Sequence, residues 1–165
     1  MAKHIYLIAL GSNQRHPKLG SPRQVVRKVI DLIDGSFGKV RAVSPIFDTP
    51  PLGPSRRHYA NAAIVLKSKL GPKKLLECLL GAEAMLGRKR RGARWRARVI
   101  DLDIVLWSGG IKANRRLQIP HPRYRSREFV LRPAARIAPG WRDPLTGLSV
   151  SQLLARLTRP RPLPK

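Results

Sequence analysis

Two carboxylates and a run of arginines occupy one short stretch of the chain and could together handle phosphate. Asp101 and Asp103 lie two residues apart in the apolar segment DLDIVL, and seven cations precede them between positions 88 and 98. In a strand, residues two apart share a face and are separated by about 6–7 Å. At that spacing two bare carboxylates repel by about 2 kcal/mol at an effective dielectric constant of about 20. The two carboxylates therefore need a positive charge close to them.

Mg²⁺ is one candidate for that counter-charge, because it binds one or two carboxylates and completes its octahedron with water and phosphate oxygens. Arginines could hold the same phosphates, since the guanidinium fork matches phosphate oxygens in pairs. The alternative is an ion-paired strand beside a solvated basic loop. The residues alone leave both interpretations open.

Composition narrows the class of protein. The 165 residues hold 34 Lys and Arg against 9 Asp and Glu, a formal net charge of +25 that would attract nucleotides, RNA or anionic lipid. Aromatic residues make up only 5%, so the stacking platforms of a single-strand nucleic-acid binder are scarce. One cysteine excludes an internal disulfide framework. Neither a signal peptide nor an apolar run of membrane-spanning length occurs, so we expect a soluble, cytoplasmic chain.

Hydrophobic patterns predict the elements that must position these residues. Strands are predicted at 4–10, 38–48, 59–66 and from about 100 to Trp107, with amphipathic helices at 22–34 and 72–86. Pro45 places the second strand at an edge or a bulge. The order βαββαβ predicts an α+β fold, with a ferredoxin-like core whose helices pack on a mainly antiparallel, four-stranded sheet.

The C-terminal third is predicted as an addition to that core. Residues 115–129 read as loop, followed by a short helix at 129–137 that Pro133 interrupts, and by a final helix at 148–157. This part must fold back over the carboxylate pair if His121 is to have a role. We expect a single domain over residues 1–158 and a basic, proline-rich tail over 159–165.

Glu83 is an acid at an unexpected place. It lies seven residues after Leu76, on the buried stripe of the second helix, where a carboxylate needs a partner. It either reaches solvent or pairs with Lys89 or Arg90, or it contacts arginines or substrate from beneath the site.

Eight motifs, in order along nearly the whole chain, carry a resemblance to a known enzyme family. They are GSN at 11–13, TPPLGP at 49–54, YxNA at 59–62, ExxxGRxR at 83–90, RW at 94–95, RxxDLDI at 98–104, RLxIPH at 116–121 and RxFVL at 127–131. With these pieces the chain resembles the 6-hydroxymethyl-7,8-dihydropterin pyrophosphokinases of folate biosynthesis. The chain departs from the family pattern at Arg96, where a small residue is usual, and at Pro122, where some members have an aromatic residue.

The resemblance implies roles for individual residues. Asp101 and Asp103 would hold two Mg²⁺ ions on the ATP phosphates, and Arg88 and Arg98 would be catalytic. Positions around the nucleotide would be Glu83, Arg90, Arg94, Ile104, Arg116, His121 and Arg127. The pterin ring would stack between Tyr59 and Phe129, which could otherwise be ordinary core aromatics. Thr49, Leu52, Asn61 and Trp95 would complete the pterin pocket.

The implied activity is transfer of a diphosphate from ATP to the pterin hydroxymethyl group, with release of AMP. Positioning, metal charge and arginine charge can supply most of the catalysis in such a transfer. We expect a monomer that binds ATP and a pterin alcohol, no membrane association, and weak nonspecific polyanion binding. The competing hypothesis is a basic nucleic-acid-binding module on the same fold, which the charge of +25 motivates.

Overall fold

The computed structural model describes residues 3–50, 58–87, 99–160 and 162–163. The helices and strands within these ranges follow one another along the chain. They are β1 His4–Ser12, α1 Pro22–Ser36, β2 Lys39–Val43, β3 Phe47–Thr49, β4 Tyr59–Ser68, α2 Pro72–Met85, β5 Asp101–Trp107, β6 Lys112–Ala113, β7 Gln118–Ile119, α3 Glu128–Ile137 and α4 Val150–Thr158, with a 3-10 turn at Tyr124–Ser126 before α3.

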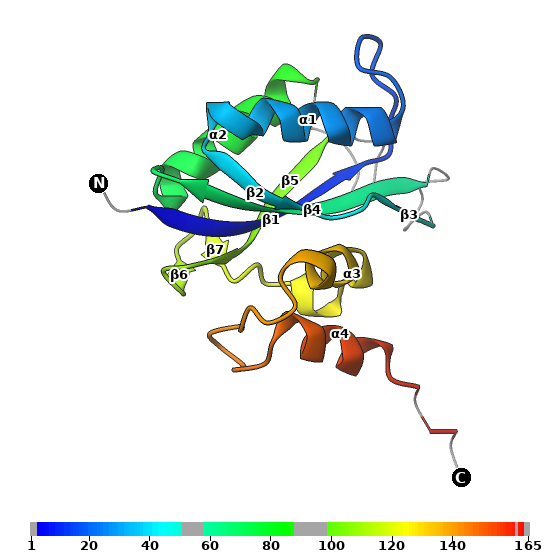
Figure 1. Cartoon of the computed structure of the whole chain (residues 1–165), viewed down its shortest axis with the longest axis vertical. Coiled ribbons are helices and arrows are strands. Elements are labelled where there is room, and N and C mark those ends of the chain that lie inside the picture. Colours follow the sequence, from blue (N-terminus) through cyan, green and yellow to red (C-terminus); the bar gives the residue numbers. More distant parts are fainter. Residues whose placement is uncertain (1–2, 51–57, 88–98, 161, 164–165) are drawn as a thin grey trace.

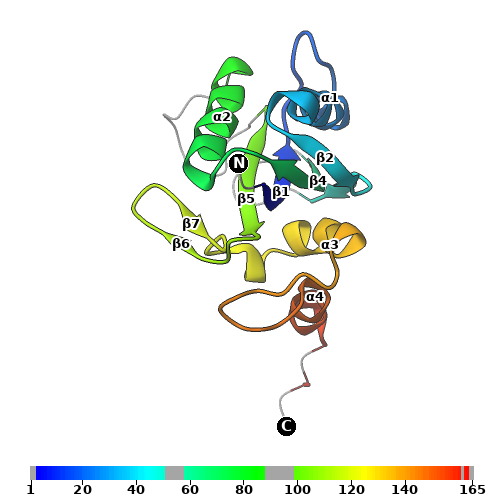
Figure 2. The ribbon, with the colours of Figure 1, turned by 60° about the vertical axis from the view of Figure 1, so that its left-hand side comes forward.

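The main sheet is mainly antiparallel, as predicted for a ferredoxin-like core, and β3 adds a fifth strand to the four that were predicted. Its order is β2-β4-β1-β5, the paired strands are antiparallel, and β3 pairs with β4 beside this path. Helices α1 and α2 lie on one face of the sheet, and α3 and α4 lie on the other (Figures 1 and 2). The α+β prediction is therefore confirmed, and the C-terminal addition turns the core into three layers.

Two apolar clusters fill the spaces between these layers. The first contains Tyr6, Ile8 and Leu10 of β1 with the buried stripes of α1 and α2. The second contains Leu7 and Ala9 of β1 with residues of α3 and α4. Because side chains alternate across a strand, odd-numbered and even-numbered residues of β1 serve different layers. Both faces of β1 are buried, as its unbroken apolar sequence indicates.

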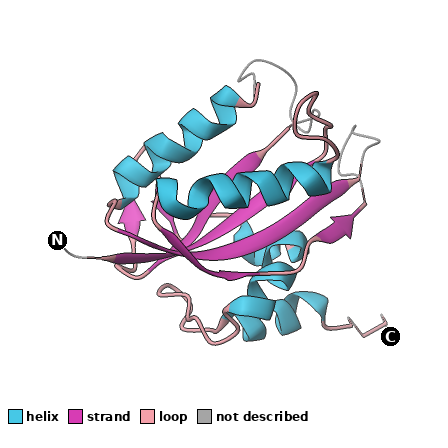
Figure 3. Ribbon diagram, turned by 45° about the horizontal axis from the view of Figure 1, so that its top comes forward, coloured by secondary structure: helices cyan, strands magenta, loops and turns pink. Residues whose placement is uncertain are grey.

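Both long helices of the core begin as the sequence predicts. Ser21 forms a capping box with Gln24, Pro22 occupies the first turn of α1, and Pro72 occupies the first turn of α2. Figure 3 shows the two helices lying across one face of the sheet. No described helix is long and apolar enough to cross a lipid bilayer.

The predicted strand at 38–48 is split in two in the structure. β2 ends at Val43 and β3 starts at Phe47, and both pair with β4. Pro45 lies in the interruption, where a residue without an N–H donor cannot continue a ladder. The break lets the chain change its register against β4, so that β3 pairs with the first residues of β4, where Tyr59 lies.

A bulge in β5 changes which residues face the helices. Ile8 pairs with Ile104 but Leu7 pairs with Leu106, so Val105 is an extra residue in the ladder. Leu102 and Ile104 pack with α1 and α2, whereas Leu106 packs with α3 and α4. From the alternation of side chains in DLDIVL, we would expect Leu106 to share a face with Ile104, and this expectation is wrong because strict alternation ends at the bulge.

The C-terminal addition is more regular than predicted. β7 lies in the segment 115–129 that was predicted as loop, and it forms a small hairpin with β6, which precedes that segment. Helix α3 runs through Pro133 to Ile137, and α4 starts after the capping box of Ser149. One proline removes a single helical hydrogen bond, and packing of the apolar side of α3 against β4 and α4 holds the helix together.

Candidate active site

Five predicted site residues lie on one face of the sheet. Gly11 of β1 pairs with Asp101 on one side and with Asn61 on the other, while Ala9 pairs with Asp103. Ala9 belongs to the cluster beneath α3 and α4, so both carboxylates are on that face. Tyr59 and Asn61 share this face with Ala63, and Thr49 is opposite Tyr59. The strand spacing puts Asp101 about 10 Å from Asn61 across the sheet.

Asn61 is buried and joined to the β3 strand. Its Nδ2 donates a hydrogen bond of 2.6 Å to Oγ1 of Thr49, and only 4% of the residue is exposed. The neighbouring residue across the ladder is Gly11, where a Cβ atom would lie 3.0 Å from Oδ1 of Asn61. The absence of a side chain at Gly11 therefore leaves Asn61 in place.

Glu83 supports the carboxylate strand from the layer of α1 and α2. The residue is 3% exposed, and its Oε1 accepts a hydrogen bond of 2.9 Å from the N–H of Leu102. β5 is an edge strand, so alternate N–H groups point away from β1 and need another partner. The alternative in which Glu83 reaches solvent is wrong. One of its contacts is with the backbone N–H between Asp101 and Asp103.

His121 comes to the carboxylates from the C-terminal addition. Its Nε2 lies 3.9 Å from Oδ2 of Asp103, and its backbone N–H donates to the carbonyl of Val105 at 3.0 Å. Burial, together with the charges of Arg127 and Arg123, lowers the pKa of His121 to about 4 against the opposing effect of Asp101. The imidazole is thus neutral at pH 7, and its contact with Asp103 is polar without being an ion pair.

The neutral His121 ring has a defined donor side. Nδ1 accepts a hydrogen bond of 3.1 Å from the N–H of Arg123, so Nδ1 carries no proton. The proton is therefore on Nε2, which faces Asp103. A ligand oxygen beside the carboxylate pair could accept a hydrogen bond from Nε2 of His121.

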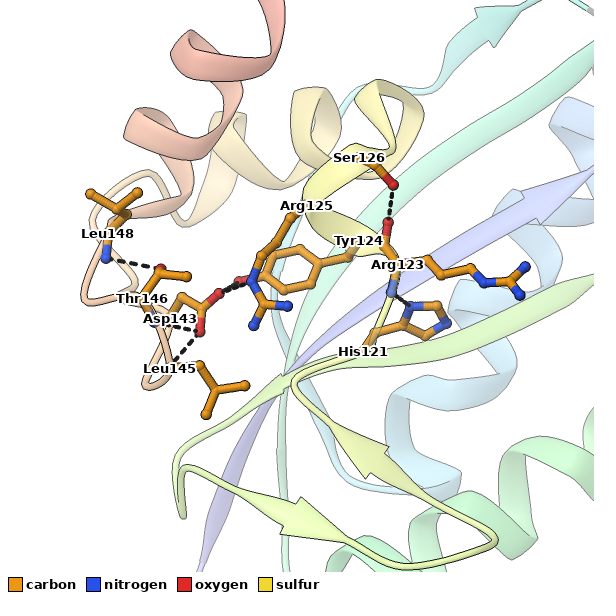
Figure 4. A network of polar contacts seen from close by, with 9 residues as sticks. All are labelled: His121, Arg123, Tyr124, Arg125, Ser126, Asp143, Leu145, Thr146 and Leu148. Atoms are coloured by element: carbon orange, nitrogen blue, oxygen red, sulfur yellow. Dashed lines mark hydrogen bonds and ion pairs between the residues drawn. The ribbon is translucent and has the colours of Figure 1, made fainter.

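A buried ion pair fixes the segment that carries His121 (Figure 4). Asp143 is 1% exposed, and its Oδ2 accepts from the hydroxyl of Tyr124 at 2.7 Å and from Nε of Arg125. Burial raises the pKa of Asp143, but hydrogen bonds from Arg125 and Tyr124 outweigh it and bring the pKa to about 2. Tyr124 also donates its N–H to the carbonyl of His121. The loop before α4 thereby anchors the histidine.

The sequence analysis missed this Asp143 network. A local signal was present, because Asp-Pro-Leu-Thr-Gly at 143–147 is typical of a turn in which an aspartate caps backbone N–H groups. Oδ1 of Asp143 does accept from Leu145 at 2.8 Å. Its partners Tyr124 and Arg125 lie 19 and 18 residues away, a distance that local patterns do not reach.

The start of α3 brings Phe129 and Arg127 to the same face. The Arg127 guanidinium lies 5.6 Å from the ring centre of Phe129. A cavity of about 460 Å³ lies between this helix start and β3, and Thr49, Arg127 and Phe129 are among its lining residues. The size falls within the range of small-ligand pockets. The segments around Thr49 and Phe129 therefore meet at one hollow.

Two residues that were predicted to lie around the nucleotide, Ile104 and Arg116, are not on the sheet face with the carboxylates. Ile104 is 4% exposed and packs in the layer of α1 and α2, on the face opposite Asp103. Arg116 lines a separate hollow of about 430 Å³ between α2 and the β6–β7 hairpin, together with Lys73 and Asn114. The predictions for six further residues lie outside the described ranges. These are Leu52, Arg88, Arg90, Arg94, Trp95 and Arg98.

The carboxylate pair has the right donors for Mg²⁺, which prefers carboxylate and phosphate oxygens. Within the described ranges, no group of three or more His, Cys, Asp or Glu side chains is close enough to hold a metal ion. Two carboxylates on one strand therefore fit a cation that takes its other ligands from water and a phosphate substrate.

Comparison with known proteins is consistent across most of the chain. A family model described as 7,8-dihydro-6-hydroxymethylpterin-pyrophosphokinase (HPPK) matches residues 7–139. The 2-amino-4-hydroxy-6-hydroxymethyldihydropteridine pyrophosphokinase of Pseudomonas aeruginosa is 36% identical over 157 residues, which cover 94% of this chain and 92% of the relative. The protein of that name from Synechocystis is 34% identical over 137 residues, covering 78% of this chain and 70% of the relative.

Solved structures show the same fold. The HPPK-DHPS protein of Plasmodium falciparum superimposes with a TM-score of 0.72 at 12% identity, over 94% of this chain. The match covers 44% of that longer chain, so the present protein spans less than half of its length.

An antiparallel sheet that presents two carboxylates on one face, with a histidine beside one of them, has the donors of a protein that binds phosphate groups through a divalent cation. Within that class the comparisons are specific. The chain belongs to the 7,8-dihydro-6-hydroxymethylpterin pyrophosphokinase family. The relatives named above are pyrophosphokinases, and nothing in their names favours the nucleic-acid-binding alternative.

Proposed function

We propose that this protein transfers a diphosphate from ATP to the hydroxymethyl group of 6-hydroxymethyl-7,8-dihydropterin, giving AMP and the pterin diphosphate. The family membership supports the reaction. The observation that carries the proposal is the convergence on one sheet face of Asp101 and Asp103 with Asn61 and Thr49. A phosphate-binding end and a ring-binding end are thus about 10 Å apart.

In the proposed reaction the pterin hydroxyl oxygen forms a bond to the β-phosphorus of ATP. The bond from that phosphorus to the oxygen bridging it to the α-phosphorus breaks, AMP leaves with the bridging oxygen, and the hydroxyl proton passes to solvent. Phosphoryl-type transfer requires alignment and charge stabilisation more than covalent help from the protein. The rigid strands β1, β4 and β5 supply that alignment.

Asp101 and Asp103 would hold Mg²⁺, and two ions are proposed from the family resemblance. When bound, Mg²⁺ neutralises phosphate charge and polarises the phosphoryl oxygens. Glu83 would keep the Asp101–Asp103 backbone in register through Leu102. His121 would donate from Nε2 to a phosphate oxygen, because its other nitrogen is occupied by the Arg123 N–H. Its low pKa argues against a role as a general base at neutral pH.

Tyr59 and Phe129 are proposed to stack on the pterin ring, and the Asn61 amide to bind its polar edge. Aromatic faces suit a flat bicyclic ring. Asn61 is held by Thr49, so little side-chain freedom would be lost on binding. From the family resemblance, Arg88 and Arg98 are proposed as the catalytic arginines, and Arg90, Arg94, Arg116 and Arg127 are proposed to lie around the nucleotide.

The test is a direct assay. The purified chain is incubated with Mg²⁺, ATP and the pterin alcohol, and nucleotides are separated by chromatography. AMP and the pterin diphosphate should form in equal amounts. Formation of ADP, or of AMP at the same rate without the pterin, would contradict the proposal. We further propose that the enzyme is a monomer in the cytoplasm and that its net charge of +25 attracts polyanions weakly.

A further inference from the structure

A second concentration of positive charge lies far from the carboxylates. A hollow of about 400 Å³ opens where β1 starts, β2 starts and β4 ends. Five cationic residues line it, and we call this site the basic hollow: Lys3, Lys39, Arg41, Lys67 and Lys69. β1 starts beside the N label in Figure 1 and runs across the sheet to Gly11, about 20 Å away at strand spacing. The basic hollow is therefore separate from the candidate active site.

The sheet itself forces two of these cations together. Lys39 of β2 and Lys67 of β4 are direct partners in the antiparallel ladder, so their side chains share one face. Like charges directly opposite each other destabilise a strand pair. Arg41 lies at the register shift in β2, two residues along from Lys39. The sheet therefore contains a lysine pair whose charges repel each other, and Arg41 adds a third positive charge close to it.

No acid offsets this charge inside the hollow. No carboxylate is among its lining residues. Across the described ranges, no ion pair joins any of the five cations to a carboxylate. Asp34, close by in sequence, uses Oδ1 to accept the N–H of Val40 at 3.1 Å. An anionic ligand would supply the missing charge.

The size of the hollow selects the kind of anion. A nucleic-acid strand carries one charge per nucleotide, so only one or two of its phosphates would enter a space of this size. A short polyphosphate places several charges on adjacent phosphorus atoms and could meet five cations at once. Phe37 and Leu70 also line the hollow and offer an apolar surface that a group attached to the phosphates could contact.

We propose that the basic hollow binds a compact polyphosphate group, either a short inorganic polyphosphate or the triphosphate of a nucleotide. The ligand lies between Lys39 and Lys67 and relieves their repulsion. Binding at this site is independent of the pyrophosphokinase reaction, because the site lies at the opposite end of β1.

Amide NMR on the full chain tests the proposal, with inorganic tripolyphosphate and ATP titrated separately in about 150 mM salt. The amides of Gly38, Lys39, Lys67 and Ser68 should shift and saturate, and the two titrations show which source binds more tightly. Signals of Asp101 and His121 report any binding at the active site separately. A single-stranded RNA 12-mer is the third probe. Shifts at the basic hollow with RNA but not with tripolyphosphate would overturn the proposal.

Matched double variants separate a site from general charge. Lys39→Gln with Lys67→Gln should weaken tripolyphosphate binding at these amides by about tenfold or more. The same variant without ligand should melt at a higher temperature than the parent, because the like-charge pair is gone. The control Arg27→Gln with Lys28→Gln removes two exposed charges from α1 and should change neither property. Equal weakening in both double variants would overturn the proposal, and turnover should match the parent in both.

Discussion

The carboxylate of Glu83 accepts a hydrogen bond from the backbone N–H of Leu102, at 2.9 Å. Leu102 lies between Asp101 and Asp103, so an acid on a core helix holds the strand that presents the two other acids. The contact satisfies an N–H group on an edge strand, which would otherwise be buried without a sheet partner. The contact also fixes the backbone that carries the two carboxylates. This matters because small displacements of catalytic groups reduce the rate of reaction.

Replacing Glu83 should therefore affect stability and turnover together. Glu83→Ala should destabilise the fold by about 1–3 kcal/mol, because it leaves the buried Leu102 N–H unsatisfied, and it should lower kcat. Glu83→Gln keeps an acceptor oxygen and should be much closer to the parent. Urea unfolding and the AMP assay measure both effects. Glu77→Ala on the exposed side of the same helix is the control, and equal losses in the two alanine variants would refute the positioning role.

Removal of the carboxylate pair should abolish activity and leave the fold intact. Asp101→Asn with Asp103→Asn removes two negative charges from one strand face, and Mg²⁺-dependent AMP formation should fall below detection. Circular dichroism should match the parent, since both residues are partly exposed. Asp31→Asn, on the exposed side of α1, should retain full turnover. Mg²⁺-dependent activity remaining in the double variant would exclude this pair as the metal site.

The core was predictable because its signals are local and repeated. Both helices could be predicted from their apolar stripes and from the residues at their starts, which are Ser21, Pro22 and Pro72. The order of the elements predicted the sheet. The errors have specific physical causes. Val105 is a bulge that moves Leu106 to the other face, and no periodic pattern marks one extra residue in a ladder.

His121 should act as a donor and not as a base. His121→Gln, whose amide can donate in place of Nε2, should lose less activity than His121→Phe, which should lose about 10–100-fold. The pKa of about 4 keeps the imidazole neutral throughout neutral pH. Accordingly, the dependence of kcat on pH between about 6 and 8 should have the same shape in the parent and in His121→Gln. A rise of kcat with pH between about 6 and 8 that is present in the parent and missing from the glutamine variant would assign His121 the role of a general base instead.

Asp143 makes the C-terminal addition sensitive to acid. Its pKa in the folded state is about 2, below the ordinary value of 3.8. The ionised form is thus favoured by folding, and the gain is complete above pH 3.8 and lost as the pH falls through 2. That gain is about 2 kcal/mol, which Asp143→Asn should lack. Unfolding free energies measured from pH 2 to pH 6 should therefore fall less steeply at low pH in the variant.

The same substitution should also reach the site, because Tyr124 and Arg125 connect Asp143 to His121. We expect Asp143→Ala to destabilise the fold by about 3 kcal/mol, as one partner of a buried ion pair is removed, and to lower turnover at saturating ATP. Glu128→Ala breaks the exposed pair with Arg132 and should cost less than about 1 kcal/mol. An Asp143→Ala protein with parental kcat would show that the network stabilises the fold without positioning His121.

The convergence of distant motifs could be expected from the sequence only through family resemblance. Thr49, Asn61 and Asp101 come from three strands, and their residue types alone do not show that β3, β4 and β5 present them on one face. The split of the strand at Pro45 decides where Thr49 falls on β4. The sequence shows that Glu83, on the buried side of its helix, needs a hydrogen-bonding partner. It does not show which partner, because the partner is a backbone N–H group, which every residue except proline has.

The final prediction concerns Gly11, which lies between the two ends of the proposed site. A methyl group there would approach Oδ1 of Asn61 to 3.0 Å and push the amide against its bond with Thr49. Gly11→Ala should therefore raise the KM for the pterin by about tenfold and leave the KM for ATP nearly unchanged. Gly81→Ala in α2 meets no atom within 4 Å and should instead stabilise the helix by about 0.5–1 kcal/mol. If Gly11→Ala raises both KM values equally, or neither, the Asn61 amide is not a pterin contact that Gly11 keeps in position.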